Sequence, residues 1–211
     1  MTTIGDLRDA LRIELHDEDD ERWQDAVLDR HLHRAARELA FVWPREQKST
    51  LTTTAGSRDL SAASLAGLVR VLAVEYPVGR YPAAFVQFSH FGQTLTLLVD
   101  RSPGEDEDVA VFWGSLHTLD SMTSTLPPAA EDAVITGAAA YSALEWASFA
   151  TNRANIGGPE AVDDYLASGE RQLARFQAML SRFGDNGRLR TSRLFVPERA
   201  EASQSVVRWE P

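Results

Sequence analysis

The sequence predicts an α+β protein: a bundle of about four helices, an inserted small antiparallel β-sheet or barrel, and an extended C-terminal arm. Apolar residues recur every three or four positions in two segments near each end of the chain. Residues 46–118 between them are rich in β-branched and aromatic residues with turn signals. One helix cannot bury its apolar stripe alone, so the two helical pairs must pack together across the insertion. The 211 residues thus divide into a helical pair at 1–45, a β subdomain at 46–120, a second pair at 121–187 and the arm at 188–211.

The first helical pair is expected at 3–15 and 23–43. Thr3 can cap the first helix, and Pro44 ends the second because proline lacks the backbone N–H that would continue it. Between them lies the acidic segment HDEDDER, in which Asp20 can help to cap the second helix. The apolar stripes of the pair are Ile4, Leu7, Leu11 and Leu15, then Leu28, Leu32, Ala35, Leu39 and Val42.

The insertion is expected to hold four to five strands. STLTTTAG ends in Gly56 and LVRVLAVEYP ends at Pro77, which are typical strand boundaries. Segments 85–91 and 94–99 flank a short Gly92–Gln93 break and predict a hairpin. The next strand, 109–116, is expected to follow the hairpin as a meander.

The second helical pair begins after STLPP, where Pro127 and Pro128 precede the first turn. Glu131 and Asp132 suit the positive end of this third helix, which runs to about residue 152. A fourth helix is expected at 159–183, ended by GDNG. RLRTSRLFVPE, which follows, is typical of a strand.

The chain has a net charge of −10, with a single lysine, Lys48, among its basic residues. Such a protein lacks the basic surface of a phosphate binder. Acids dominate residues 1–22 and arginines dominate 181–211, which suits head-to-tail or ring assembly, although ordinary surface variation would give the same pattern. There is no cysteine, no apolar run of membrane-spanning length and no segment typical of a secretory signal. These features fit a protein made in a reducing cytosol, with no membrane partner.

No enzyme signature is present, and neither a metal nor a cofactor is expected. The acidic run lacks the spacing of a calcium loop and is typical of a solvated joint. His31 and His33 are two positions apart on a helix and cannot clasp one metal. No serine elbow or phosphate-binding glycine loop occurs. An alternative enzyme would need convergence of Asp59, Glu75, His90 and His117 in the insertion.

The insertion also carries five aromatic residues in its strands. Aromatic residues in alternating strands usually form a core, but on the surface they can form a carbohydrate- or host-binding platform. Exposure of these side chains would separate the two interpretations. The residues are Phe85, Phe88, Phe91, Phe112 and Trp113.

The third helix is unusually rich in small residues, and large apolar residues are spaced between them. The helix is therefore apolar on nearly every side. A helix that is apolar nearly all round is surrounded. Either it is the central helix of its own bundle, or a second face meets another subunit. Glu145 interrupts the apolar surface: either it is buried and needs a partner, such as an arginine, or it points outward. The candidate subunit-interface residues are Gly137, Ala138, Tyr141, Glu145 and Trp146.

These segments resemble the head-to-tail connector, or adaptor, proteins of long-tailed bacteriophages and gene transfer agents. The resemblance covers about 1–43 and 120–185, and its opening helical pair has a short acidic joint and a tryptophan at the start of the second helix. The family's helix reads LP…ED…GAA.YA, and Ser142 stands here for the usual final alanine. It is matched by Leu126, Pro127, Glu131, Asp132, Gly137, Ala138, Ala139 and Tyr141.

The resemblance implies a structural virion protein at the head–tail junction, made in the host cytoplasm. Such adaptors form rings, commonly of twelve copies, beneath the portal, and genome DNA passes through the ring. An acidic, lysine-poor lining would let DNA slide. The face opposite the portal receives the next neck or tail protein. The acidic residues expected to give the ring one chemically distinct face are Asp17, Glu18, Asp19, Asp20 and Glu21.

The resemblance also implies that the C-terminal arm docks on the portal. LFV at 194–196 and VVRW at 206–209 would be apolar anchors, since an extended segment can add to a sheet edge. The alternative is that the arm folds back on its own helices. The candidate docking residues are Arg188, Arg190, Arg193, Leu194, Phe195, Val196, Val206, Val207, Arg208 and Trp209.

Overall fold

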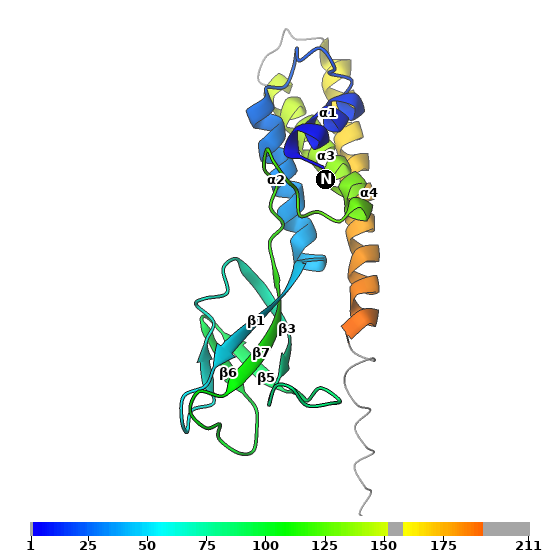
Figure 1. Ribbon diagram of the computed structural model, residues 1–211. Helices are drawn as coiled ribbons and strands as arrows, with labels where there is room; N and C mark the ends of the chain where they lie inside the picture. Colours follow the sequence, from blue (N-terminus) through cyan, green and yellow to red (C-terminus); the bar gives the residue numbers. More distant parts are fainter. Residues whose placement is uncertain (1, 152–157, 192–211) are drawn as a thin grey trace, which may run out of the picture. The chain divides into compact units, whose positions relative to one another are not determined.

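The computed structural model describes residues 2–151 and 158–191 and has an α+β fold, as expected (Figure 1). The chain divides into two compact units. Of the described residues, the first comprises 2–47, Gly67–Arg70, 114–151 and 158–184, and the second comprises Lys48–Ala66, Val71–Trp113 and 185–191. Each unit is described in turn.

Among the described residues, four helices contribute to the first unit: α1 (Ile4–Leu15), α2 (Asp25–Val42), α3 (Pro128–Thr151) and α4 (Gly158–Thr191), the last as far as Gly184. Thr3 caps α1 in a complete capping box with Asp6, as the sequence predicts. The predicted cap of α2 is wrong, because its N-cap residue is Gln24 and makes no side-chain cap bond. Instead, Asp20 pairs with Arg12.

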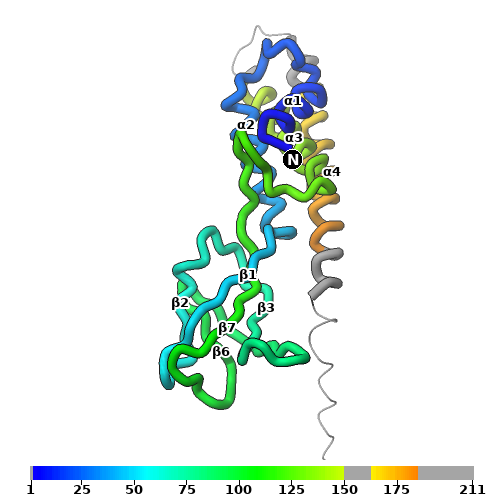
Figure 2. Tube along the Cα trace, in the orientation of Figure 1, coloured from blue at the N-terminus to red at the C-terminus, as the bar shows by residue number. Residues whose placement is uncertain are grey.

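Helix α3 is the centre of this bundle. It packs against α1 and α2, and Gly137 and Gly169 bring it into close approach with α4. Figures 1 and 2 both show α3 between α2 and α4. The core formed here includes Leu7, Leu11, Leu28, Leu32, Leu39, Ala133, Val134, Ala138, Ala139 and Phe176.

The expected end of the fourth helix at GDNG is wrong, because α4 continues to Thr191. A glycine inside a helix costs only about 1 kcal/mol relative to alanine, and the leucine and arginines that follow are good helix formers. The first four residues of the expected arm are therefore helical, and the strand expected from 188 does not begin there.

In the part of the chain that the structure describes, seven strands form two sheets, where the sequence predicts four to five strands. One has the order β1 (Arg45–Thr52), β7 (Asp108–Ser115), β3 (Leu68–Glu75) and β4 (Phe85–Val86). The other has the order β2 (Asp59–Ser61), β6 (Thr94–Leu97) and β5 (Phe88–Phe91). The hairpin predicted over 85–99 is confirmed, since β5 and β6 pair antiparallel with Phe88 opposite Leu97.

The meander predicted for 109–116 is wrong. Strand β7 leaves the hairpin and lies between β1 and β3 in the other sheet. Its residues Val109, Ala110, Val111 and Trp113 are buried, and a strand with neighbours on both sides suits such a nearly continuous apolar sequence.

Candidate assembly surfaces

The small-residue side of α3 is covered by the chain itself. A Cβ atom at Gly137 would stand 2.9 Å from the ring of Phe176 on α4. Ala138 is fully buried, and the buried ring of Tyr141 makes an edge contact with Phe176 at 6.4 Å between centroids. Of the two interpretations of this helix, the described residues support the central helix of its own bundle.

The other two interface candidates lie at a more open end of α3. Trp146 is partly buried and stacks obliquely against Trp23, with ring centroids 5.8 Å apart. Glu145 is exposed and pairs with Arg30 of α2. Of the two alternatives for Glu145, the structure therefore shows the outward one, and the exposed carboxylate has an arginine partner as well.

A row of polar side chains connects α2 and α3, and we call it the α2–α3 seam: Arg30, His31, Arg34 and Glu38 on α2, with Tyr141 and Glu145 on α3. Tyr141 donates its hydroxyl to Glu38 at 2.7 Å. The guanidinium of Arg34 lies 3.8 Å from the Tyr141 ring centroid. Burial, reinforced by the bond to Glu38, raises the pKa of Tyr141, so its hydroxyl stays a neutral donor.

His31 is the buried member of the seam. Its Nε2 lies 2.7 Å from the Glu145 carboxylate, and both ring nitrogens are buried without a well-aligned hydrogen bond among the described residues. Burial lowers the pKa of His31 below the usual 6.5, outweighing the attraction of Glu145, and Arg30 and Arg34 act in the same direction as burial. Burial alone would raise the pKa of Glu145, but Arg30 and His31 together lower it.

We expect this histidine to make the bundle less stable in mild acid. Because the folded state favours the neutral ring, its contribution is complete above pH 6.5, the ordinary pKa, and is lost as the pH falls toward the lower folded pKa. Urea unfolding at pH 8, 7, 6 and 5.5 measures the effect. The variant His31→Gln should have a flatter profile, and identical slopes in the two proteins would contradict this role.

The acidic joint between α1 and α2 is built around a buried ion pair. Asp17 is 4% exposed, and its carboxylate accepts the guanidinium of Arg12 at 3.2 Å. It also accepts the backbone N–H groups of Arg22 at 3.0 Å and Trp23 at 3.2 Å. Arg12 pairs further with Asp20 at 2.6 Å and Asp25 at 2.7 Å. Asp17 therefore holds the joint in shape and is not part of a solvated face.

The remaining acids of the joint are free for other contacts. Glu18, Asp19 and Glu21 are exposed. None of the three has an ion pair or side-chain hydrogen bond within residues 2–151 and 158–191. The joint thus offers three unpaired carboxylates over four residues.

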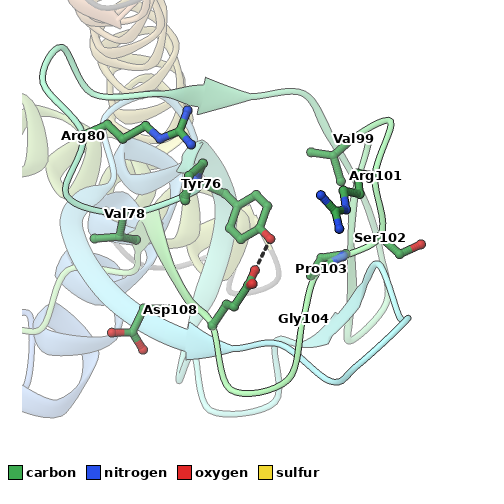
Figure 3. A pocket seen from close by; sticks show the side chains of 11 residues that line it. Tyr76, Val78, Arg80, Val99, Arg101, Ser102, Pro103, Gly104 and Asp108 are labelled. Atoms are coloured by element: carbon green, nitrogen blue, oxygen red, sulfur yellow. Dashed lines mark hydrogen bonds between the residues drawn. The ribbon is translucent and has the colours of Figure 1, made fainter.

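The second unit contains a cleft of about 980 Å³ beside the β3–β4 loop (Figure 3). Tyr76 lies at its centre and donates its hydroxyl to Glu107. That bond, with burial, raises the pKa of Tyr76. The guanidinium groups of Arg80 and Arg101 flank the tyrosine ring in Figure 3. No sequence signal points to this cleft, because its two arginines are far apart in the chain and no motif links them.

Among the residues named for an enzyme, Glu75 lies in the four-stranded sheet, whereas Asp59 and His90 lie in the three-stranded sheet. Asp59 and Ser89 both lie opposite Thr96, whereas His90 lies opposite Leu95. Asp59 and His90 therefore occupy opposite faces of the three-stranded sheet. His117 is buried with its ring nitrogens 3.0 Å and 2.8 Å from the backbone carbonyls of Thr125 and Trp43. The described residues contain no group of three or more His, Asp or Glu side chains suited to a metal ion.

The aromatic residues of the insertion are divided between core and surface. Trp113 is buried and donates its indole N–H to Ser49 at 3.0 Å. Phe85 and Phe112 stack at 5.9 Å, and Phe88 is partly buried. Phe91 is 89% exposed. Four of the five aromatic residues are thus wholly or partly buried, as the core interpretation predicts.

Most of the candidate docking arm lies outside the described residues. Arg188 and Arg190 fall within α4. The other candidates, Arg193, Leu194, Phe195, Val196, Val206, Val207, Arg208 and Trp209, lie in 192–211. Their docking role stays a prediction from the sequence. No helix among the described residues is long and apolar enough to cross a membrane.

Comparison with known proteins finds similar chains only among solved structures. No protein-family model matches the chain, and no curated protein matches it. Among solved structures it is similar to a chain in "Neck of empty GTA particle computed with C6 symmetry", where GTA denotes a gene transfer agent. The two are 18% identical, the match covers 66% of this chain and 77% of that one, and the TM-score is 0.29.

Proposed function

We propose that this chain is a head-to-tail adaptor, a structural protein of the virion neck. In this role it forms a ring, with twelve copies as the expected number, below the portal. Genome DNA passes through the ring, the C-terminal arm docks on the portal, and the opposite face binds the next neck or tail protein. The protein acts by assembly and not by catalysis.

The observation that carries the proposal is the structural position of the residues behind the adaptor resemblance. Leu126, Ala138, Ala139 and Tyr141 are all buried in the bundle, and Gly137 permits the close approach of Phe176. The family pattern therefore coincides with the axis of a helical bundle that a β-rich unit interrupts. A chance match of small residues on a solvent-facing helix would not have this property.

The charge of the chain supports the same role. A net charge of −10 repels the phosphates of DNA, so a ring of such subunits guides a passing duplex without holding it. Repeated head-to-tail contacts between identical subunits close into a ring when the rotation between neighbours allows it. The unpaired carboxylates of the acidic joint provide one chemically distinct surface for such contacts.

We expect deletion of residues 203–211 to abolish tight binding to the portal while leaving the helical bundle folded. The deletion removes Val206, Val207 and Trp209, and loss of about 3 kcal/mol of apolar burial corresponds to roughly a hundredfold weaker binding. Pull-down and interferometry with purified portal measure the affinity, and circular dichroism checks the fold.

Gln204→Ala is the matched control for that deletion, since it changes the same segment without removing an apolar anchor. The truncated protein binding portal at full strength would refute the docking role. A reconstruction of the particle by electron microscopy tests the wider proposal, and a location away from the head–tail junction would overturn it.

A further inference from the structure

We propose that the cleft of the second unit binds the acidic joint of a neighbouring copy of this chain. The two partners in this contact are Arg80 and Arg101 on one copy and the carboxylates of Glu18, Asp19 and Glu21 on the other. The inference rests on the proposed function only for the closure of these contacts into a ring.

The first support is the distribution of basic side chains in the second unit. Residues Lys48–Ala66 and Val71–Trp113 of this unit contain four: Lys48, Arg58, Arg80 and Arg101. Lys48 lies near Glu75 and over the ring of Phe112. Arg58 donates to the backbone carbonyls of Val99 at 2.9 Å and Asp100 at 2.8 Å. The two that have no such partner in the described part of the unit, Arg80 and Arg101, both line the cleft.

The second support is that the acids of the cleft leave these arginines available. The Glu107 carboxylate accepts the hydroxyl of Tyr76. A Cβ atom at Gly104 would stand 2.6 Å from that carboxylate, so the absence of a side chain at residue 104 leaves room for the Glu107 carboxylate. In Figure 3 the carboxylate of Asp108 points away from both arginines.

The frame of the cleft is held in place by its own chain. Thr53 donates its backbone N–H to the Glu107 carbonyl at 3.0 Å, and its hydroxyl oxygen accepts the Glu107 N–H at 3.0 Å. Fixed walls lower the cost of ordering a bound segment. The volume of about 980 Å³ lies at the upper end of the usual range for ligand pockets, which is adequate for a few residues of an extended loop.

The third support is the matching surplus of negative charge on the same chain. Asp17 and Asp20 are already paired with Arg12, which leaves Glu18, Asp19 and Glu21 without partners. Arginine and carboxylate form strong, geometrically specific pairs. Because the joint belongs to the first unit and the cleft to the second, the same contact can repeat from copy to copy in one direction.

Disulfide trapping tests the contact directly, because the natural chain has no cysteine. One full-length protein carries Asp19→Cys in the joint and the other carries Ser102→Cys in the cleft. We expect mild oxidation of the mixture to give a crosslinked heterodimer. Asp19→Cys mixed with Ser64→Cys, an exposed position in the second unit, is the matched control. Equal yields in the two mixtures would overturn the inference.

Charge reversal tests the chemistry. Arg80→Glu/Arg101→Glu and Glu18→Arg/Asp19→Arg/Glu21→Arg should each weaken self-association at least tenfold at low salt, measured by sedimentation velocity. A mixture of the two variants restores opposite charges at every contact and should restore assembly. Arg171→Glu/Arg175→Glu changes two exposed arginines of α4 and should have no effect. Failure of the mixture to recover would contradict the contact.

These results distinguish the contact from the adaptor role. Trapping and rescue without binding to portal would uphold the contact and refute the adaptor. Normal portal-bound rings from the cleft variant would refute the contact and uphold the adaptor. If the cleft variant fails on the particle while no crosslink forms, the cleft binds an acidic segment of another protein, and the inference of a second copy is overturned.

Discussion

Phe176→Ala is expected to lower the free energy of unfolding by about 3–5 kcal/mol, the usual cost of emptying a fully buried aromatic site. Phe176 has no exposed surface and fills the space that Gly137 leaves between α3 and α4. Its ring also makes the edge contact with Tyr141. Chemical denaturation monitored by circular dichroism measures the loss.

Leu166→Ala on the same helix is the control for Phe176→Ala. Leu166 is 42% exposed, so its truncation should cost about 1 kcal/mol or less. A second comparison isolates the close approach of the two helices: Gly137→Ala should be less harmful when Phe176 is replaced by leucine, because the crowded ring is then absent. Equal losses for Phe176→Ala and Leu166→Ala would show that α4 does not hold the bundle together in this way.

Asp17→Ala is expected to cost about 3–5 kcal/mol, because it breaks a buried pair and leaves buried donors without an acceptor. The Asp17 carboxylate accepts hydrogen bonds from the guanidinium of Arg12 and from the backbone N–H groups of Arg22 and Trp23. Urea unfolding at neutral pH and constant salt measures the loss.

Two variants in the same acidic run sharpen that experiment. Asp17→Asn keeps acceptor oxygen but removes the charge, and should fall between wild type and Asp17→Ala. Asp19→Ala removes an exposed, unpaired carboxylate and should change stability by no more than about 0.5 kcal/mol. If Asp17→Ala were as mild as Asp19→Ala, the joint would be a solvated loop, as its composition alone suggests.

The helices were predictable because their signals are local. Apolar spacing, the Thr3 cap and the Pro44 stop depend on neighbours within one or two turns, and the observed bounds of α1 and α2 agree with them. The end of α4 was missed because glycine weakens a helix without forbidding it. The sequence shows that a glycine destabilises the helix locally, but it does not show which other interactions of the helix outweigh that cost.

The sheet partners were not predictable in the same way. Hairpin β5–β6 forms between neighbours in sequence, and its turn is visible as Gly92. Strand β7 instead lies between β1 and β3, which are far from it in the chain. An apolar, two-sided strand signals burial but carries no information on which strands flank it.

The candidate surfaces differ from the sequence expectation for a related reason. Asp17 and Glu18 are adjacent and both acidic, yet one is buried beside Arg12 and the other is exposed. Arg80 and Arg101 are separated in the chain by three strands, β4, β5 and β6, and both line the cleft. Charge composition shows how much charge a segment carries, whereas pairing across the fold determines which charges stay available.

The enclosure of α3 also bears on how such a protein can diverge. Gly137, Ala138 and Tyr141 are packed against other parts of the same chain. A substitution at any of these positions therefore changes the stability of the bundle and does not directly change a surface that binds another protein. Lineages that acquire new neighbours would therefore retain small residues along this helix while the cleft and the acidic joint change together. Relatives would then share the sequence of α3 even where their partners differ, and the sequences of the cleft and the acidic joint would vary with the partner.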